Sequence, residues 1–262
     1  MNRLAKITLI AIAILASSSS LSYGAGKKDK EVWNETLDHY FMKNSAETVA
    51  PDAEGFIKRW LLLEPISKPN RGNTVFIDSY IRETFAKQYF EGQMTMLPVD
   101  GQKVKAIEEV EVMDKNAQPG DFRRMMAPAK IEEAKTTLTW HALDSKRFNV
   151  KLFRFAEGYG KNHYSLICWA VTVINCEEDM TVRMAVGSNS ASQWWVNGEE
   201  AVILSGDRRM VQDDCTSKRI TLHKGKNIVR GAVINGPGMS DFCVRFLDED
   251  GKPVKNITAS FK

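Results

Sequence analysis

A group of aromatic and charged residues in the second half of the chain has the residue types that recognise sugars. Trp194 and Trp195 are adjacent, and four charged residues follow them in one predicted loop: Asp207, Arg208, Arg209 and Asp213. An indole face stacks on sugar C–H groups, a guanidinium is a rigid fork of donors, and a carboxylate accepts hydrogen bonds from hydroxyls. This pattern predicts a carbohydrate-binding surface, and an Arg–Asp network that only holds the loop is an equal alternative.

A β-hairpin is the element that must position the two tryptophans. The apolar runs 194–196 and 201–204 flank Asn197-Gly198, which favours a type I′ turn. Neighbours on a strand face opposite sides of the sheet, so both rings are buried only if each face is covered. We expect Trp195 to pack in the core and Trp194 to line a groove with Asp207 and Arg208.

Catalytic chemistry has little support in the sequence. His141, which follows Trp140 in a predicted strand, is the one histidine to test as a general base, and a structural role is the commoner alternative. We place Trp140 and His141 with the candidate binding residues. The chain lacks Gly-x-Ser-x-Gly, His-x-x-x-His and Cys-x-x-Cys, and adjacent carboxylates such as Asp213-Asp214 point apart on a strand. We therefore predict no catalytic residue, no metal and no cofactor.

The first residues have the order of a secretory signal peptide. Arg3 and Lys6 precede an apolar run at 7–16, and small residues follow at 17–24. The run is too short to span a bilayer, and cleavage after Gly24 lowers the formal net charge from +3 to +1. We expect a secreted or periplasmic protein without a membrane span, and the mixed charges do not favour nucleic acid.

Four cysteines remain in the expected mature chain: Cys168, Cys176, Cys215 and Cys243. In an oxidising compartment they form up to two disulfides, with three connectivities. Cys168 and Cys243 lie within apolar runs, so buried free thiols are the alternative. The sequence leaves both states open.

Hydrophobic periodicity predicts an all-β domain with one or two N-terminal helices. We expect a tail and helix at 25–54, then a β-sandwich domain at 55–262 that contains a second helix, capped by Asp78 with the stripe Ile81, Phe85 and Tyr89. Residues 98–135 read as short strands and a long exposed excursion. Short β-rich segments with regular turns predict an antiparallel sandwich; they lie at 56–63, 138–142, 150–155, 164–174, 181–186, 193–196, 201–204, 217–222, 227–235 and 241–247.

Several of these segments carry a family resemblance over about residues 55–255. Arg59-Trp60-Leu61-Leu62, Trp195-Val196-Asn197-Gly198-Glu199-Glu200 and Leu222-His223-Lys224-Gly225-Lys226-Asn227 occur in the order that resembles the galactose-binding-domain-like jelly rolls of secreted bacterial polysaccharide-degradation proteins. Some members of this group are labelled acetylxylan esterase. The resemblance implies a jelly-roll sandwich that handles polysaccharides or oligosaccharides. Relatives often have acidic residues where this chain has Asn189-Ser190, so we expect no calcium site.

Two functional classes follow from the sequence. The first is a secreted, non-catalytic carbohydrate-binding or accessory protein in polysaccharide utilisation. The alternative is a carbohydrate esterase, acetylxylan-esterase-like, or a related glycan hydrolase. An envelope assembly module is a weaker third hypothesis, in which the N-terminal helix would dock on an envelope protein partner.

Overall fold

The structure is a computed structural model that describes residues 33–70, 76–112 and 130–262. The predicted signal peptide, the start of the predicted tail and the middle of the predicted excursion lie outside these residues. No helix in the described ranges is long and apolar enough to cross a lipid bilayer.

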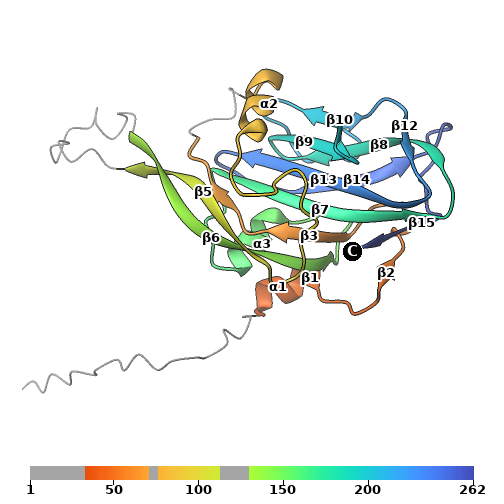
Figure 1. Ribbon diagram of the computed structural model, residues 1–262, viewed down its shortest axis with the longest axis horizontal. Coiled ribbons are helices and arrows are strands. Elements are labelled where there is room, and N and C mark those ends of the chain that lie inside the picture. Colours follow the sequence, from red (N-terminus) through yellow and green to blue (C-terminus); the bar gives the residue numbers. More distant parts are fainter. Residues whose placement is uncertain (1–32, 71–75, 113–129) are drawn as a thin grey trace, which may run out of the picture. The chain divides into compact units, whose positions relative to one another are not determined.

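Two antiparallel β-sheets form the body of the described chain (Figure 1). The large sheet has the central order β1-β6-β3-β7-β13-β9-β10, and the small sheet has β8 at its centre with β14 on one side and β11 and β12 on the other. The large sheet comprises β1 (Phe41–Met42), β2 (Thr48–Val49), β3 (Arg59–Leu63), β4 (Ile66–Ser67), β5 (Lys103–Val112), β6 (Lys130–Ser145), β7 (Leu166–Cys176), β9 (Ala191–Val196), β10 (Glu199–Leu204), β13 (Gly225–Asn235) and β15 (Ile257–Ser260). The small sheet comprises β8 (Met180–Ser188), β11 (Cys215–Thr216), β12 (Ile220–Leu222) and β14 (Phe242–Leu247). The predicted all-β antiparallel sandwich is confirmed.

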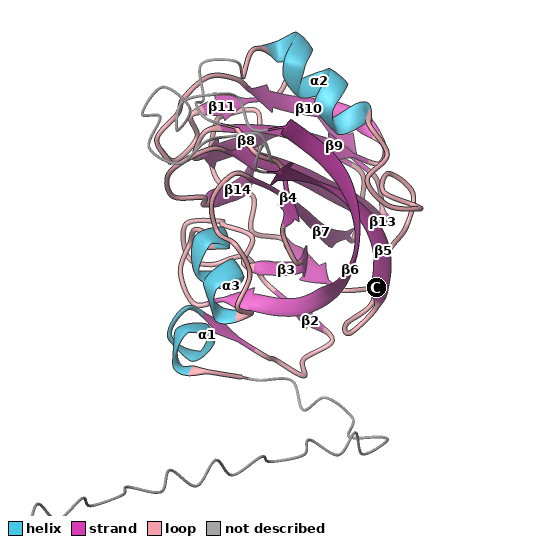
Figure 2. Cartoon of the chain, turned by 90° about the vertical axis from the view of Figure 1, so that its left-hand side faces the viewer, coloured by secondary structure: helices cyan, strands magenta, loops and turns pink. Residues whose placement is uncertain are grey.

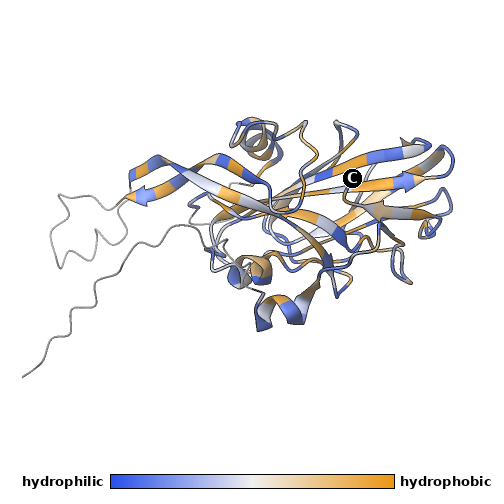
Figure 3. Ribbon diagram, turned by 60° about the horizontal axis from the view of Figure 1, so that its bottom comes forward, coloured by the Kyte–Doolittle hydropathy of each residue, from blue (hydrophilic) through white to orange (hydrophobic). Residues whose placement is uncertain are grey.

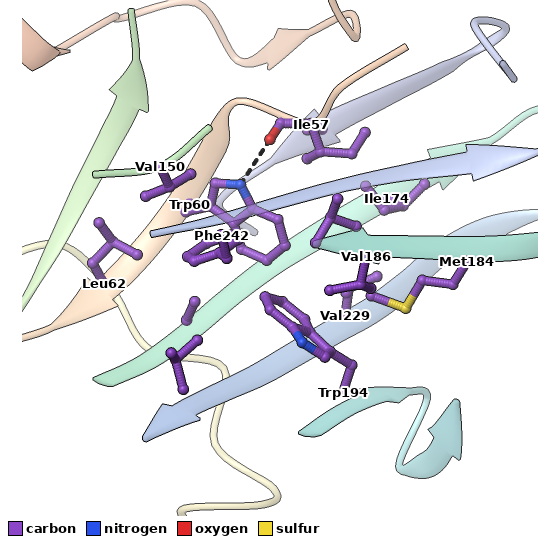
Figure 4. Packing of buried hydrophobic residues seen from close by; sticks show 14 of the residues in the cluster. Ile57, Trp60, Leu62, Val150, Ile174, Met184, Val186, Trp194, Val229 and Phe242 are labelled. Atoms are coloured by element: carbon purple, nitrogen blue, oxygen red, sulfur yellow. Dashed lines mark hydrogen bonds between the residues drawn. The ribbon is translucent and has the colours of Figure 1, made fainter. Parts of the chain in front are cut away.

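The large sheet is buried on both faces, and strand alternation decides which side chain enters which core. On β3, Trp60 and Leu62 enter the core between the two sheets, whereas Leu61 and Leu63 enter a second core on the opposite face. We call these the inner and the outer core. Trp60 and Trp194 pack edge to face in the inner core, with ring centroids 5.8 Å apart (Figure 4).

A helix covers the outer core. In α2 (Asp78–Ala86) the buried residues are Ile81, Thr84 and Phe85, and the Phe85 ring packs against Trp169 and Trp195. Ile77, not Asp78, occupies the N-cap position, so the predicted capping role of Asp78 is wrong. The Asp78 carboxylate lies in the first turn, where it interacts favourably with the helix dipole.

Two further helices lie next to each other at the opposite end of the large sheet from α2 (Figure 2). In α1 (Glu35–Tyr40) the Asn34 side chain accepts a hydrogen bond from Leu37 N–H at 3.0 Å, which caps the first turn. We predicted a strand at 150–155, but only Val150 makes a β-bridge, and α3 (Leu152–Gly158) follows. That prediction is wrong because Leu152, Phe155 and Ala156 have helical spacing and are all buried.

The predicted excursion is a long two-stranded ribbon. Strands β5 and β6 pair from Lys103↔Thr139 to Val112↔Lys130. Hydrophilic and hydrophobic residues alternate along the ribbon, as the banded colours of Figure 3 show. Lys68 of the segment after β4 binds Glu109 of β5 at 2.6 Å, which ties the ribbon to the edge of the body.

Candidate functional site

The predicted hairpin is confirmed, but the predicted groove beside it is not. Asn197 has φ 53° and Gly198 has φ 89°, and β9 pairs with β10 directly across this two-residue turn. Trp194 is fully buried in the inner core and Trp195 is 7% exposed in the outer core. The expectation that Trp194 lines a groove is wrong, because the small sheet covers one face of the hairpin and α2 covers the other.

The charged loop after the hairpin is held by ion pairs. Arg208 Nη1 lies 2.5 Å from Asp214 Oδ2, and Arg245 Nε donates to Asp213 Oδ1 at 2.9 Å. Asp207 and Arg209 are exposed in the same loop. Trp194 is buried away from these residues, and the Arg208–Asp214 and Arg245–Asp213 pairs correspond to the loop-holding network.

The two remaining predicted residues lie on β6. The Trp140 ring is fully buried in the outer core, against Phe90, and is closed to any ligand. His141 is 5% exposed, stacks on Tyr159 with ring centroids 3.8 Å apart, and lies 3.4 Å from Glu64 through Nε2. The His141 ring therefore lies between the Glu64 carboxylate and the rings of Tyr159 and Phe155.

A polar pocket of about 620 Å³ combines an aromatic side chain with polar side chains, a combination that was expected beside the hairpin. Three segments distant in sequence line it: Ser67, Pro69 and Asn70; Val110 and Glu111; Asn162, Tyr164 and Ser165. Tyr164 is 44% exposed and is the aromatic residue of the pocket. An aromatic face among a few convergent polar groups can stack on an apolar surface of a small molecule and hydrogen-bond to its polar groups.

Hydrogen bonds between neighbouring segments build this pocket. Lys68 N–H donates to Ser165 O at 2.8 Å, and Ser165 N–H donates to Gly236 O at 2.9 Å. The Lys68–Glu109 ion pair fixes the third wall, because Glu109 lies on β5 directly before Val110 and Glu111. Burial raises the pKa of Glu109, but hydrogen bonds and charge from Lys68 and Lys87 outweigh burial and lower it overall.

The turn that carries Tyr164 has a defined and strained conformation. Asn162 Nδ2 donates to Tyr164 O at 2.8 Å, and Tyr164 N–H donates back to Asn162 Oδ1 at 3.1 Å. Ser165 has φ 52°, a left-handed backbone that is uncommon for a residue with a side chain. Such strain persists where the surroundings enforce it, which is frequent at binding sites.

An aromatic cluster supports Tyr164 from outside the pocket. The Phe153 ring lies 5.5 Å from the Tyr164 ring, and the His163 ring lies 4.4 Å from it. Phe153 and His163 are half-buried. The Tyr164 ring is therefore held by its neighbours while part of its surface stays open.

Two smaller pockets, of about 350 and 270 Å³, have no aromatic residue in their lining. No group of three or more His, Cys, Asp or Glu within the described ranges is arranged to hold a metal ion. The Tyr164 pocket, which combines an exposed aromatic ring with polar side chains, is the candidate site.

Sequence reasoning missed every residue of this pocket. Tyr164 stands at the start of the strand predicted at 164–174. The available signal was the run Asn162-His163-Tyr164-Ser165, in which amide, aromatic and hydroxyl side chains are adjacent in the sequence. Nothing in the sequence indicated that Ser67–Asn70 and Val110–Glu111 would join it.

No family model matches the sequence, and no curated protein matches it either. The resemblance to galactose-binding-domain-like jelly rolls therefore stays a prediction. Among solved structures, the chain is similar to a PA14 sugar-binding domain from an RTX adhesin, at 12% identity and a TM-score of 0.40, over 78% of this chain and 99% of that one. It is also similar to the PA14 domain of the MpAFP antifreeze protein, at 10% identity and a TM-score of 0.37, over 84% and 96% of the two chains.

A third similarity is to a β-glucosidase from Kluyveromyces marxianus in complex with glucose, at 15% identity and a TM-score of 0.31. It covers 58% of this chain and 17% of the enzyme. At these identities and TM-scores the similarities carry no inference about the ligand of this chain.

Proposed function

We propose that this protein is an exported, non-catalytic carbohydrate-binding protein whose ligand site is the Tyr164 pocket. The observation that carries the proposal is one exposed aromatic ring set among side chains that hydrogen-bond to hydroxyls. A sugar ring offers an apolar C–H face and a rim of hydroxyls, and the pocket offers the complementary surfaces. Export and a role in polysaccharide utilisation are part of the proposal and rest on the N-terminal pattern and the family resemblance.

The polar lining suits hydroxyl groups. Asn70 and Asn162 have amide side chains, which both donate and accept, and Ser67 and Ser165 have hydroxyls. Glu111 supplies the carboxylate of the lining, an acceptor for paired hydroxyl donors. Hydrolysis of a glycosidic bond commonly needs two facing carboxylates, so this lining favours binding over cleavage.

Glycan-array screening of the mature protein, followed by titration calorimetry, tests the proposal. Tyr164→Ala should weaken binding of the identified glycan about tenfold or more, as expected for an aromatic anchor. Tyr164→Phe keeps the stacking face and should bind nearly as the wild type does. Val211→Ala, at a residue that is 53% exposed and outside the pocket lining, is the control. Binding that survives Tyr164→Ala and Asn162→Ala together would exclude this pocket as the site.

The carbohydrate-esterase alternative rests on one observation, the 3.4 Å approach of His141 Nε2 to Glu64 Oε1. A carboxylate can orient a histidine that acts as a general base. Hydrolysis of p-nitrophenyl acetate by the wild-type protein, abolished in His141→Gln, would favour this second function. Equal rates for both proteins, at the level of the buffer, would remove it.

A further inference from the structure

We propose that Glu64 is the positioning residue of the Tyr164 pocket. Its carboxylate holds the turn at 159–165 in place through Lys161 and His141, so the affinity for the ligand depends on whether Glu64 is ionised. This inference rests on the proposed function for its ligand, but not for the ordering of the turn.

Glu64 lies where β3 ends and is almost closed to solvent. Its side chain is 10% exposed. Oε2 lies 3.0 Å from Lys161 Nζ and accepts a hydrogen bond from Thr139 N–H at 3.1 Å, while Oε1 lies 3.4 Å from His141 Nε2. One carboxylate therefore joins the end of β3, the middle of β6 and the turn that follows α3.

Two residues, Tyr159 and Lys161, hold the turn in place before the chain reaches the pocket. Tyr159 stacks on His141 at 3.8 Å between ring centroids, and Lys161 reaches Glu64. Asn162, the next residue, is the first of the turn to line the pocket. At the other end of the turn, Ser165 is held by main-chain hydrogen bonds to Lys68 and Gly236.

At the first end of the turn, Tyr159 stacks on His141 and Lys161 N–H donates to Ala156 O at 2.8 Å, so only the side-chain contact of Lys161 with Glu64 depends on charge. The main-chain bonds of Ser165 persist at any moderate pH, whereas the grip on Lys161 needs an ionised Glu64. If that grip is lost, Asn162 and Tyr164 keep their mutual hydrogen bonds but lose the support that sets their distance from Asn70 and Glu111. The pocket then loses its shape without unfolding of the sheets.

The charged groups that face Glu64 give the direction of the pH effect. They are His141 from β6 and Lys161 from the turn. Burial raises the pKa of Glu64, but hydrogen bonds from His141 and Lys161, the Lys161 charge and the Thr139 N–H outweigh burial, so its pKa is lowered overall. His141 must present Nε2–H to the carboxylate, and both its neutral Nε2–H tautomer and its cation do so. Affinity should therefore hold through neutral pH and fall as the pH drops through the lowered pKa of Glu64.

Hydrogen exchange read by mass spectrometry tests the grip without any ligand. Peptides that cover 159–165 are compared with peptides that cover the 196–199 hairpin turn in the wild type, Glu64→Gln and Lys161→Met. We expect about tenfold faster exchange at 159–165 in both variants and unchanged exchange in the hairpin. Lys161 is 35% exposed, so we expect Lys161→Met to fold. It tests the same contact if Glu64→Gln does not fold. Arg219→Met, which breaks the exposed pair with Glu249, is the matched control and should change neither peptide.

The second experiment measures binding of the glycan that the glycan array identifies. Glu64→Gln should bind it about tenfold more weakly at pH 7, Glu64→Asp should restore part of that loss, and proteins with a carboxylate at this position should lose more affinity in acid than Glu64→Gln does. Unchanged exchange at 159–165 in Glu64→Gln and in Lys161→Met would overturn the inference. If no glycan binds the wild type while exchange responds as expected, the proposed function fails and the positioning role of Glu64 stands.

Discussion

The indole ring of Trp194 on β9 lies directly over Gly231 on β13, its cross-strand partner. A Cβ atom on Gly231 would come within 2.2 Å of ring atom Cζ3. The absence of a side chain at Gly231 is what allows the largest aromatic residue to lie flat on the inner face of the sheet.

Replacing Gly231 with Ala should overpack this contact. We expect a loss of about 1–3 kcal/mol in the free energy of unfolding, measured by urea titration, because a packed core cannot absorb an extra methyl group. Trp194→Phe, which leaves room, should recover part of the loss in the double variant. Trp195→Phe, on the opposite face, should not. Additive effects for Gly231→Ala and Trp194→Phe would contradict the contact.

The effect of a substitution at Gly198 in the hairpin turn should come from backbone conformation alone. Its φ is 89°, and no atom lies within 4 Å of the position that a Cβ would take there, so a substitution meets strain but no clash. Gly198→Val should cost about 1 kcal/mol or more, since a β-branched residue is disfavoured at positive φ. Gly198→Asn should cost much less. Equal stability of the Val variant and the wild type in denaturant unfolding would argue against the type I′ turn.

A buried ion pair between β3 and β6 should be far more sensitive to mutation than an exposed ion pair. Arg59 is fully buried and Asp144 is 2% exposed, and the guanidinium binds both carboxylate oxygens, at 2.8 and 2.9 Å. Asp144→Ala should cost about 3–5 kcal/mol, because it leaves a buried charge without its partner. Glu249→Ala, in the exposed pair with Arg219, should cost about 0–1 kcal/mol in the same thermal unfolding assay.

The four cysteines should be free thiols. Cys215 on β11 and Cys243 on β14 flank β8 on opposite sides, about 10 Å apart by strand spacing, which exceeds disulfide reach. Burial raises the pKa of Cys243 to about 12 and that of Cys168 further, so neither forms a reactive thiolate near neutral pH. Iodoacetamide should label half-buried Cys215 first in the native protein, and a reductant should leave the melting temperature unchanged. A mass loss of 2 Da per cysteine pair would reveal a disulfide instead.

The predicted signal peptide has a direct test. Cleavage after Gly24 should give an exported protein that begins at Ala25. N-terminal sequencing of material from the culture medium or the periplasm checks this. A protein recovered there with Met1 intact would exclude processing.

Local patterns in the sequence were sufficient for several strands and the hairpin, but not for α3, where a strand was predicted. Alternation along 181–186 and the Asn-Gly pair at 197–198 predicted β8 and the β9–β10 turn, because a strand's side chains alternate and a two-residue turn needs positive φ. The same alternation showed that Trp194 and Trp195 face opposite sides. These properties depend on residues within a few positions of each other.

Only the tertiary structure decided which surfaces stay open. Trp195 is buried because Phe85 of α2, more than a hundred residues earlier, packs on it, and the strand pattern of β9 has no information about that helix. The Tyr164 pocket likewise exists because Asn70, Glu111 and Asn162 come from three separate segments that meet through the Lys68–Ser165 and Lys68–Glu109 contacts. A sequence pattern fixes the direction in which a side chain points, whereas its exposure depends on which distant segment packs against that face.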